Sequence, residues 1–255
     1  MAVRRMYFLP CGWLTVNQTI LTNRKGYDSY VDIPVVSVLI DTDDGYVLYD
    51  TGLDPAGLTD PENTWGDKAK AIKTMTAEHD IRNQLAKLGL RPSDIRYVVN
   101  SHFHYDHTGG NRFFTESKIL VQKAEYRFAL YPDSFVSGVY LKHQYDHPLQ
   151  YELLEGDTEV VDGVHIFTSY GHSPGHQSLV VKLPKSGTAV LVGDAMYCRE
   201  NYATNIPPGN AWNMPLMFDS MKKLAHLAKI CEGKLYITHD PSFWDEHQPA
   251  PFYYE

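Results

Sequence analysis

The stretch Ser101-His-Phe-His-Tyr-Asp-His-Thr-Gly-Gly110 decides how this chain folds and what it can bind. It directly follows the apolar segment Ile95-Arg-Tyr-Val-Val99, whose β-branched residues predict a buried strand. His102 and His104 are two residues apart, so in an extended chain their imidazoles point the same way. Both side chains can therefore reach one metal ion.

Asp106 and His107 come where the Gly-Gly pair allows the backbone to bend sharply. A carboxylate and an imidazole at such a turn can face a second metal close to the first. Imidazole nitrogen and carboxylate oxygen without thiolate suit Zn²⁺, and also Fe, Mn or Co. A polar surface loop that happens to be rich in His is the alternative. Three His and one Asp within the six residues 102–107 argue against it.

Four side chains cannot complete two metal sites, so further ligands must come from other segments. Three candidates follow apolar runs and have metal-binding side chains: His172 in Ser169-Tyr-Gly-His-Ser-Pro-Gly-His176, Asp194 in Gly193-Asp-Ala195, and His239 in Leu235-Tyr-Ile-Thr-His-Asp240. A carboxylate such as Asp194 can bridge two cations, with one oxygen on each. His176 is expected to orient its neighbours rather than to bind metal itself.

Two β-hairpins of similar layout are predicted in separate parts of the chain. The first joins Val35–Ile40 to Tyr46–Tyr49, and the second joins Ser178–Leu183 to Thr188–Val192. Each second strand leads directly to an aspartate, Asp50 or Asp194. The repetition suggests a duplicated β-rich half.

Amphipathic helices are expected to cover the sheets. One is predicted from the cap Thr76 to about Leu88, and another from the cap Asp219 to Cys231, with Gly233 after it. Residues 53–75 are rich in Pro, Gly and Asp and predict a long loop that lies over the site. No linker composition is visible, so residues 1–255 are predicted to form a single domain.

The composition narrows the choice of partners and compartment. The formal net charge is −8 and Lys and Arg are scattered, which argues against nucleic acid or an anionic membrane as a partner. Three cysteines at wide spacing, Cys11, Cys198 and Cys231, show no disulfide framework and suit a reducing compartment. No run approaches the ~18 apolar residues of a membrane span. We expect a cytoplasmic enzyme with a small-molecule substrate and without stable membrane association, and a homodimer is one option for its assembly.

These motifs together resemble the metallo-β-lactamase superfamily. HxHxDH, a later His in Gly-His-Ser-Pro-Gly-His, an Asp after a strand and a final His after a strand occur in the order of that superfamily. The resemblance covers nearly the whole chain. It implies an α/β fold, an αββα sandwich with two β-rich halves and helices on the outside, which would account for the repeated hairpin.

Within the superfamily, the chain is most similar to the N-acyl-homoserine lactonases, the quorum-quenching enzymes. The similar segments are Tyr7-Phe-Leu-Pro-Cys-Gly12, Leu154-Glu-Gly-Asp-Thr-Glu-Val-Val-Asp-Gly163, and Asp194-Ala-Met-Tyr197 followed by Glu200-Asn201. Tyr105 departs from the family, which often has Phe at that position, and this leaves the shape or polarity of the pocket open.

The resemblance implies a role for each site residue. One metal would be held by His102, His104 and His172, the other by Asp106, His107 and His239, and Asp194 would bridge them. Tyr197 would donate a hydrogen bond to the lactone carbonyl, and Asp106 would carry a proton to the ring oxygen as it leaves. An apolar groove would take the acyl chain, and its candidate lining residues are Trp13, Leu14, Trp65, Tyr202 and Trp212.

Other functions share parts of this pattern. A lactonase for another ring, such as a pyridoxine-derived lactone, would have the same metal motif. A glyoxalase-type thioesterase usually adds a C-terminal helical domain, and only sixteen residues follow His239 here. A true β-lactamase often has a Cys ligand, and a nuclease would want a basic surface. A di-iron electron-transfer module would need a glutamate ligand beside the His set. The C-terminal helical domain, the Cys ligand, the basic surface and the glutamate ligand are not found in the sequence, so the other lactone ring is the alternative that stays open.

Overall fold

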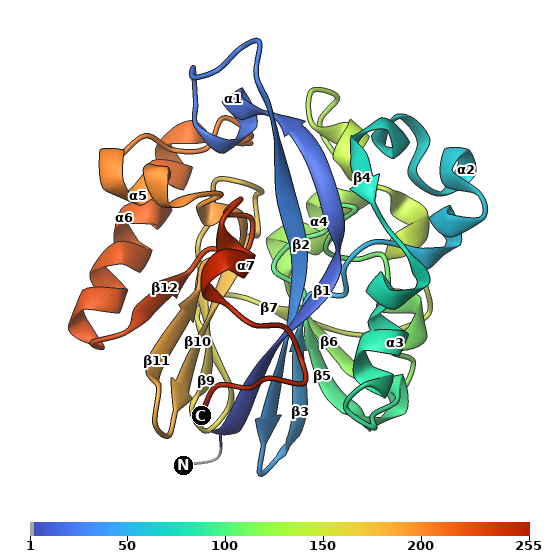
Figure 1. Cartoon of the computed structure of the whole chain (residues 1–255), viewed down its shortest axis with the longest axis vertical. Helices are drawn as coiled ribbons and strands as arrows, with labels where there is room; N and C mark the ends of the chain where they lie inside the picture. The colour runs from blue at the N-terminus through green and yellow to red at the C-terminus, as the bar shows by residue number, and fades with distance from the viewer. Residues whose placement is uncertain (1–2) are drawn as a thin grey trace.

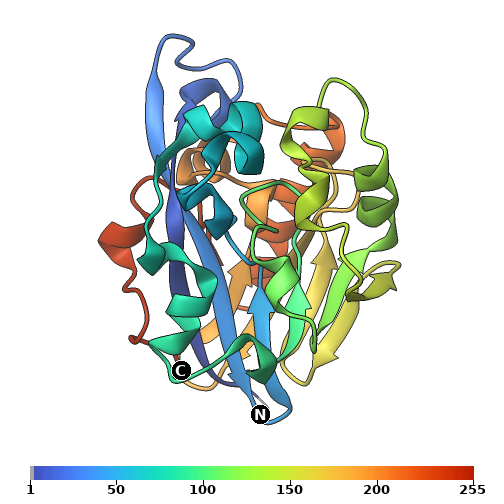
Figure 2. The same ribbon diagram turned by 90° about the vertical axis from the view of Figure 1, so that its right-hand side faces the viewer.

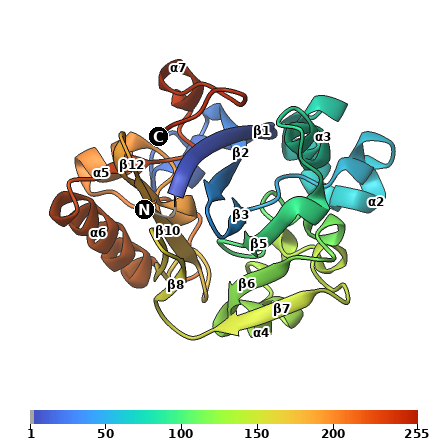
Figure 3. The same cartoon turned by 90° about the horizontal axis from the view of Figure 1, so that it is seen from below.

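The computed structural model of the chain describes residues 3–255. Over these residues two β-sheets face each other and helices cover their outer surfaces, as the view from below shows (Figure 3). The seven-stranded sheet has the order β4 (Ile72–Thr74), β1 (Val3–Asn17), β2 (Tyr30–Thr42), β3 (Gly45–Tyr49), β5 (Ile95–Val99), β6 (Lys118–Gln122), β7 (Gln150–Leu154). The five-stranded sheet has the order β12 (Lys234–Tyr236), β11 (Gly187–Leu191), β10 (Gln177–Leu183), β9 (Val164–Thr168), β8 (Thr158–Val161). This arrangement confirms the predicted αββα sandwich.

Both predicted hairpins are present. Strands β2 and β3 pair antiparallel and turn at Gly45, whose φ of 104° is one that residues with a side chain rarely adopt. Strands β10 and β11 pair in the same way and turn at Gly187, with φ of 79°. Each hairpin delivers its aspartate, Asp50 or Asp194, just beyond the second strand. The two aspartates therefore hold equivalent positions in the two sheets.

Strand β2 shows why its sequence is an unbroken apolar run rather than an alternating one. Side chains of a strand point alternately to its two faces. Val36, Val38 and Ile40 lie in the core between the sheets, whereas Val35 and Leu39 lie in the core under the outer helices. Because both faces of the larger sheet are covered, both sets are buried.

The helices form the outer layers (Figures 1 and 2). They are α1 (Gln18–Leu21), α2 (Pro61–Trp65), α3 (Ile81–Ala86), α4 (Lys123–Leu130), α5 (Arg199–Thr204), α6 (Met214–Ile230) and α7 (Phe243–Glu246). Helices α3 and α4 pack on the larger sheet, and α6 packs on the smaller one. Among the described residues, no helix is long and apolar enough to cross a membrane.

The predicted start of the last long helix is wrong. Helix α6 begins at Met214, because the side chain of Asn213 accepts a hydrogen bond from the Leu216 N–H at 3.1 Å and caps it. Pro215 fits in the first turn, where the N–H that proline lacks would have no helical partner. Asp219, the predicted cap, lies inside the helix instead.

The segment before β5 is also more divided than predicted. Thr76 caps only the 3₁₀ turn Ala77–His79, and Asp80 then caps α3, because its carboxylate accepts the Arg82 N–H at 2.9 Å. The predicted loop over residues 53–75 contains α2, two 3₁₀ turns (Pro55–Leu58 and Gly66–Ala71) and strand β4, which pairs with β1. Those pairings extend the larger sheet, so the segment is ordered structure and not a plain loop.

Candidate metal centre

All seven predicted metal-binding side chains come together at one end of the sandwich. Strands β3 and β5 are parallel, so Asp50 and the stretch 102–107 leave the larger sheet at the same edge. Strands β11 and β12 are also parallel, so Asp194 and His239 leave the smaller sheet side by side. His172 lies on the connection between β9 and β10.

The first group consists of His102, His104 and His172. The Nε2 atom of His172 lies 3.1 Å from Nε2 of His102 and 2.9 Å from Nδ1 of His104. All three side chains are buried. Ligand atoms at a zinc–nitrogen distance of ~2.0–2.1 Å in a tetrahedron are about 3.4 Å apart. The three nitrogens are close to that separation.

The second group consists of Asp106, His107 and His239. The Asp106 Oδ2 atom lies 3.5 Å from Nε2 of His107 and 3.6 Å from Nε2 of His239. The ligand atoms of the group all lie within 4.8 Å of one another. A cation between them would have two nitrogens and one carboxylate oxygen.

Asp194 lies between the two groups and turns one oxygen to each. Its Oδ1 is 3.3 Å from Nε2 of both His107 and His239. Its Oδ2 is 3.3 Å from Nε2 of His172 and 3.9 Å from Nε2 of His102. This is the geometry expected of a carboxylate that bridges two cations.

For two imidazoles, a backbone carbonyl determines which ring nitrogen carries the proton. Nδ1 of His239 is 2.7 Å from the Pro34 carbonyl oxygen, and Nδ1 of His172 is 2.8 Å from that of Asn210. A carbonyl oxygen only accepts, so each Nδ1 carries the proton and donates it. The lone pair of each ring is then on Nε2, which points into the cluster.

Asp50 determines the proton position on His107 directly and on His102 through Ser101. Nδ1 of His107 donates to Asp50 Oδ2 at 2.8 Å, and the Ser101 hydroxyl donates to the same oxygen at 2.8 Å. That hydroxyl has no second proton, so it accepts from Nδ1 of His102 at 2.9 Å. Sequence reasoning missed this role, although the position of Asp50 after the first hairpin, equivalent to that of Asp194, was a signal for it.

The residues fit a pair of cations. Three buried atoms have no hydrogen-bond partner among residues 3–255: Nε2 of His107, Nε2 of His239 and Oδ1 of Asp194. Each such atom costs about 1–3 kcal/mol unless something binds it. Burial alone would lower the pKa of His107, but the charges of Asp194, Asp106 and Asp50 raise it well above its ordinary value. The carboxylates therefore give the cluster a negative electrostatic potential, which suits a dinuclear metal site.

His176 holds the backbone of Asp194 in place by a hydrogen bond. Its Nε2 accepts the backbone N–H of Asp194 at 3.0 Å, and its Nδ1 lies 2.8 Å from the Ser169 hydroxyl. Burial lowers the pKa of His176 to about 3, which keeps Nε2 free to accept. His176 thereby acts on the site through the backbone rather than as a ligand.

Tyr197 reaches the same aspartate from the other side. Its hydroxyl donates to Asp194 Oδ2 at 2.6 Å and accepts from the Asn210 side chain at 3.3 Å. Its ring stacks on His239, with centroids 5.1 Å apart. Burial and then the charge of Asp194 raise its pKa well above the ordinary value, so the phenol keeps its proton.

A cavity of about 110 Å³ opens on the cluster. It is lined by Leu14, Val16, Ile20, Ile33, Lys68, Ala71, His104, Tyr105, Asp106, Val139, Tyr197 and Asn210. Of the five predicted groove residues, only Leu14 is among them. Trp13 is its neighbour on β1 and so faces the other side of the sheet. Trp65 is instead buried against Gly57.

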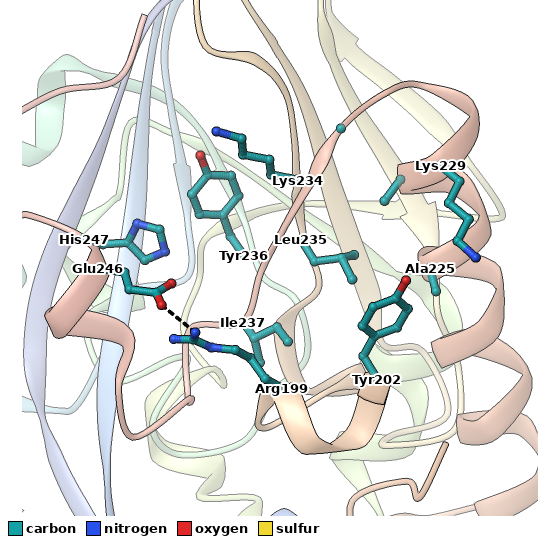
Figure 4. A pocket seen from close by; sticks show the side chains of 12 residues that line it. Arg199, Tyr202, Ala225, Lys229, Lys234, Leu235, Tyr236, Ile237, Glu246 and His247 are labelled. Carbon is teal, nitrogen blue, oxygen red and sulfur yellow. Dashed lines mark hydrogen bonds and ion pairs between the residues drawn. The ribbon is translucent and has the colours of Figure 1, made fainter. Parts of the chain in front are cut away.

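A larger cavity of about 430 Å³ lies elsewhere, between α6, β12 and α7 (Figure 4). Tyr202, another predicted groove residue, lines this cavity together with Arg199, which pairs with Glu246. None of the seven metal-binding side chains borders it. By size alone this cavity would be chosen as the active site, but the metal-binding side chains lie beside the smaller cavity.

Fold and site together define a metal-dependent hydrolase built as an αββα sandwich, and comparison with known proteins agrees. The family model of the Metallo-beta-lactamase superfamily matches residues 30–229. The N-acyl homoserine lactonase AiiA of Bacillus thuringiensis subsp. kurstaki is 33% identical over 94% of each chain, and the N-acyl homoserine lactonase AttM of Azorhizobium caulinodans is 33% identical over 98% of each. A solved N-acyl homoserine lactone hydrolase, with N-hexanoyl-L-homoserine at its catalytic metal center, aligns over 100% of both chains with a TM-score of 0.88 and 32% identity. This chain belongs to the metallo-beta-lactamase superfamily and, within it, to the N-acyl homoserine lactonases.

Proposed function

We propose that this enzyme opens the lactone ring of N-acyl-homoserine lactones and releases N-acyl-homoserines. The relatives named above support this activity. The observation in this chain that supports it best is the cavity beside the His/Asp cluster. Aliphatic side chains such as Leu14, Ile33 and Val139 line it, and His104 and Asp106 border it as well. An acyl chain fits against the first set while its lactone meets the second.

The metal ligands follow from the two groups. We assign His102, His104 and His172 to one divalent ion, the second group to the other, and Asp194 to both. Zn²⁺ is our first choice, since nitrogen and carboxylate ligands suit it, and Fe, Mn and Co share this preference. When bound, the metals supply activation of the nucleophile and polarisation of the carbonyl.

Two side chains of the cavity are assigned to the reacting atoms. The Tyr197 hydroxyl has one proton, which it shares with Asp194 in this structure. To donate to the lactone carbonyl it must rotate that proton away from Asp194, which the stacked ring permits without moving. Asp106 borders the same cavity, and we assign to it the transfer of a proton to the departing ring oxygen.

The proposal also covers the domain organisation, the compartment and the type of substrate. We infer that residues 1–255 act as one domain, because side chains of both sheets share one core. The free thiols of Cys11, Cys198 and Cys231 support a reducing compartment such as the cytoplasm. The net charge of −8 supports a small-molecule substrate rather than nucleic acid.

A series of acyl-homoserine lactones of increasing chain length tests the substrate directly. We expect kcat/KM to rise while added methylenes still enter the aliphatic cavity, by at most about fourfold per methylene, since burial of each gives ~0.8 kcal/mol. Acid release at fixed pH measures the rate, and a lactone without an acyl chain and an aromatic lactone are the controls. Rates near background at every length, or a preference for the aromatic ring, would contradict the substrate assignment.

Tyr197→Phe tests the assignment of the hydroxyl. We expect kcat to fall by ~10- to ~1000-fold, by analogy with the ~100- to ~1000-fold loss when a donor to the developing oxyanion is removed. Metal content should stay the same, because Tyr197 touches Asp194 and no other metal-binding residue through its hydroxyl. Tyr145→Phe, which removes a buried hydroxyl bonded to the Ala129 carbonyl, is a matched control. Equal effects of the two variants would show that Tyr197 is only a packing residue.

A further inference from the structure

Glu125 is a fully buried carboxylate in the first turn of α4. Its Oε1 accepts from the Phe103 N–H and from the Tyr140 hydroxyl, both at 3.0 Å. Its Oε2 accepts from the Ser173 hydroxyl at 2.6 Å and from the Gly175 N–H at 3.0 Å. A buried carboxylate is tolerated when its oxygens are hydrogen-bonded in this way. The four bonds therefore define both its place and its orientation.

The partners of Glu125 all adjoin the first group of metal ligands. Phe103 lies between His102 and His104 in the chain, and its N–H holds the backbone that carries both. The Tyr140 ring packs edge-on against the imidazole of His104, with centroids 4.8 Å apart at 81°. One carboxylate oxygen thus supports two of the three imidazoles of the group.

The other oxygen supports the third imidazole. Ser173 directly follows His172, and Gly175 is two residues further on. A Cβ at Gly175 would lie 2.3 Å from the backbone nitrogen of Glu125, so only glycine lets this loop come so close to α4. The close approach and the two hydrogen bonds tie the His172 loop to the start of the helix.

The second group has separate supports. His107 is held by Asp50, and His239 is held by the carbonyl of Pro34. Glu125 bonds to neither, and its four partners belong to the segments around the first group and to Tyr140. Asp50 also reaches His102 through Ser101, but the hydrogen bonds of Glu125 lead only to the first group.

We propose that Glu125 is the positioning residue of the first metal site, where it holds His102, His104 and His172 in one arrangement and selectively sets the metal affinity of that site. It acts through the backbone and through Tyr140, not as a ligand. The proposal rests on the metal assignment of the proposed function, but not on the identity of the lactone.

Glu125→Gln tests the proposal, because glutamine keeps the shape and replaces one acceptor oxygen by an NH₂ donor. The zinc-loaded protein is dialysed against graded concentrations of a chelator, and metal per chain is measured by mass spectrometry. We expect one equivalent to leave at ~10- to ~100-fold lower chelator concentration than in the unaltered enzyme, the usual effect of losing a group that orients a ligand. The other equivalent should leave as before.

Asp50→Asn is the matched control, since it also replaces a buried carboxylate that accepts a backbone N–H and a hydroxyl. Asp50 bonds to His107 directly and reaches His102 through Ser101, so its variant should release both equivalents at lower chelator concentration. The same pattern of metal loss in both variants would mean general loosening and would overturn the proposal. So would wild-type retention of both equivalents in Glu125→Gln with a lower unfolding temperature, because the role would then be structural only.

Milder variants cover the case in which Glu125→Gln does not fold. Ser173→Ala and Tyr140→Phe each remove one donor to Glu125 and keep the carboxylate. Each should lower the affinity of the first site by a smaller factor, and unchanged retention in both would overturn the proposal. Metal retention is read without substrate, so an enzyme that binds both metals but leaves acyl-homoserine lactones intact would contradict only the proposed function.

Discussion

Asp194→Asn is expected to release metal from both halves of the centre and to lower the rate of lactone hydrolysis by more than ~100-fold. That factor is the upper range for losing a group that merely orients a ligand, and Asp194 itself faces both sites. Its two oxygens lie 3.3 Å from Nε2 of His239 and 3.3 Å from Nε2 of His172 respectively. Asparagine keeps one oxygen and presents an NH₂ group, which cannot bind a cation, to the other site.

Metal per chain and kcat/KM for N-hexanoyl-homoserine lactone measure the two effects. Asp80→Asn is the control, because Asp80 is also buried but caps α3 and pairs with Arg82. It should lose stability and keep its metal. Full metal content and full rate in Asp194→Asn would disprove the bridging role.

Removal of the metals by a chelator is expected to bring lactone hydrolysis close to background and to lower the thermal unfolding midpoint. The ligands come from both sheets, so cations bound to them hold the two halves of the sandwich together. Binding to the folded state alone stabilises it by about 4 kcal/mol at a thousandfold excess over Kd. At about 2–4 °C per kcal/mol for a chain of this size, the midpoint should fall by on the order of 10 °C.

Calorimetry and rate measurements before and after chelation test this expectation. Zn²⁺, Co²⁺, Mn²⁺ and Fe²⁺ are then added back separately, and the metal that restores both rate and midpoint is the one the site prefers. Full hydrolysis by protein freed of metal would exclude the metal-dependent mechanism. Recovery of the midpoint without recovery of the rate would show a structural role for the metals only.

The ligand set could be predicted because each member carries its own local signal. His102, His172 and His239 are metal-binding residue types that follow apolar segments, and the two hairpins end in aspartates. Strand ends collect at the edges of a sheet, so residues at several strand ends have a good chance of meeting. The structure brings all seven together.

Glu125 had no such signal. Its partners Phe103, Tyr140 and Gly175 are 22, 15 and 50 residues away in the chain, and no spacing or periodicity links them. Within α4 it looks like an ordinary acidic residue in a first turn, where the helix dipole favours it. Only the packing of the two ligand-bearing loops against the start of α4 shows that it is buried and fully bonded.

Four of the five residues predicted to line the acyl groove do not line this cavity, for a related reason. The aromatic residues chosen for it were selected by type, but a shift of one residue on a strand turns a side chain to the opposite face. Leu14 therefore lines the cavity while Trp13 does not. Tyr105 lines it as well, so the departure from the family that the sequence revealed does fall in the pocket.

By itself the sequence determined the two hairpins and the strand before the His stretch, which side chains can bind metal and in which order they occur, because those properties depend on residue type and near neighbours. The tertiary structure alone decided which oxygen of Asp194 faces which group, which nitrogen of each imidazole is free, and which carboxylates stand behind the ligands. These features depend on distances between segments far apart in the chain, and such distances exist only once the two sheets have packed together. The His102–His107 stretch illustrates both contributions. Its residue types predicted a metal site, and only the tertiary structure shows that Asp50 and Glu125, from two other segments, hold it in place.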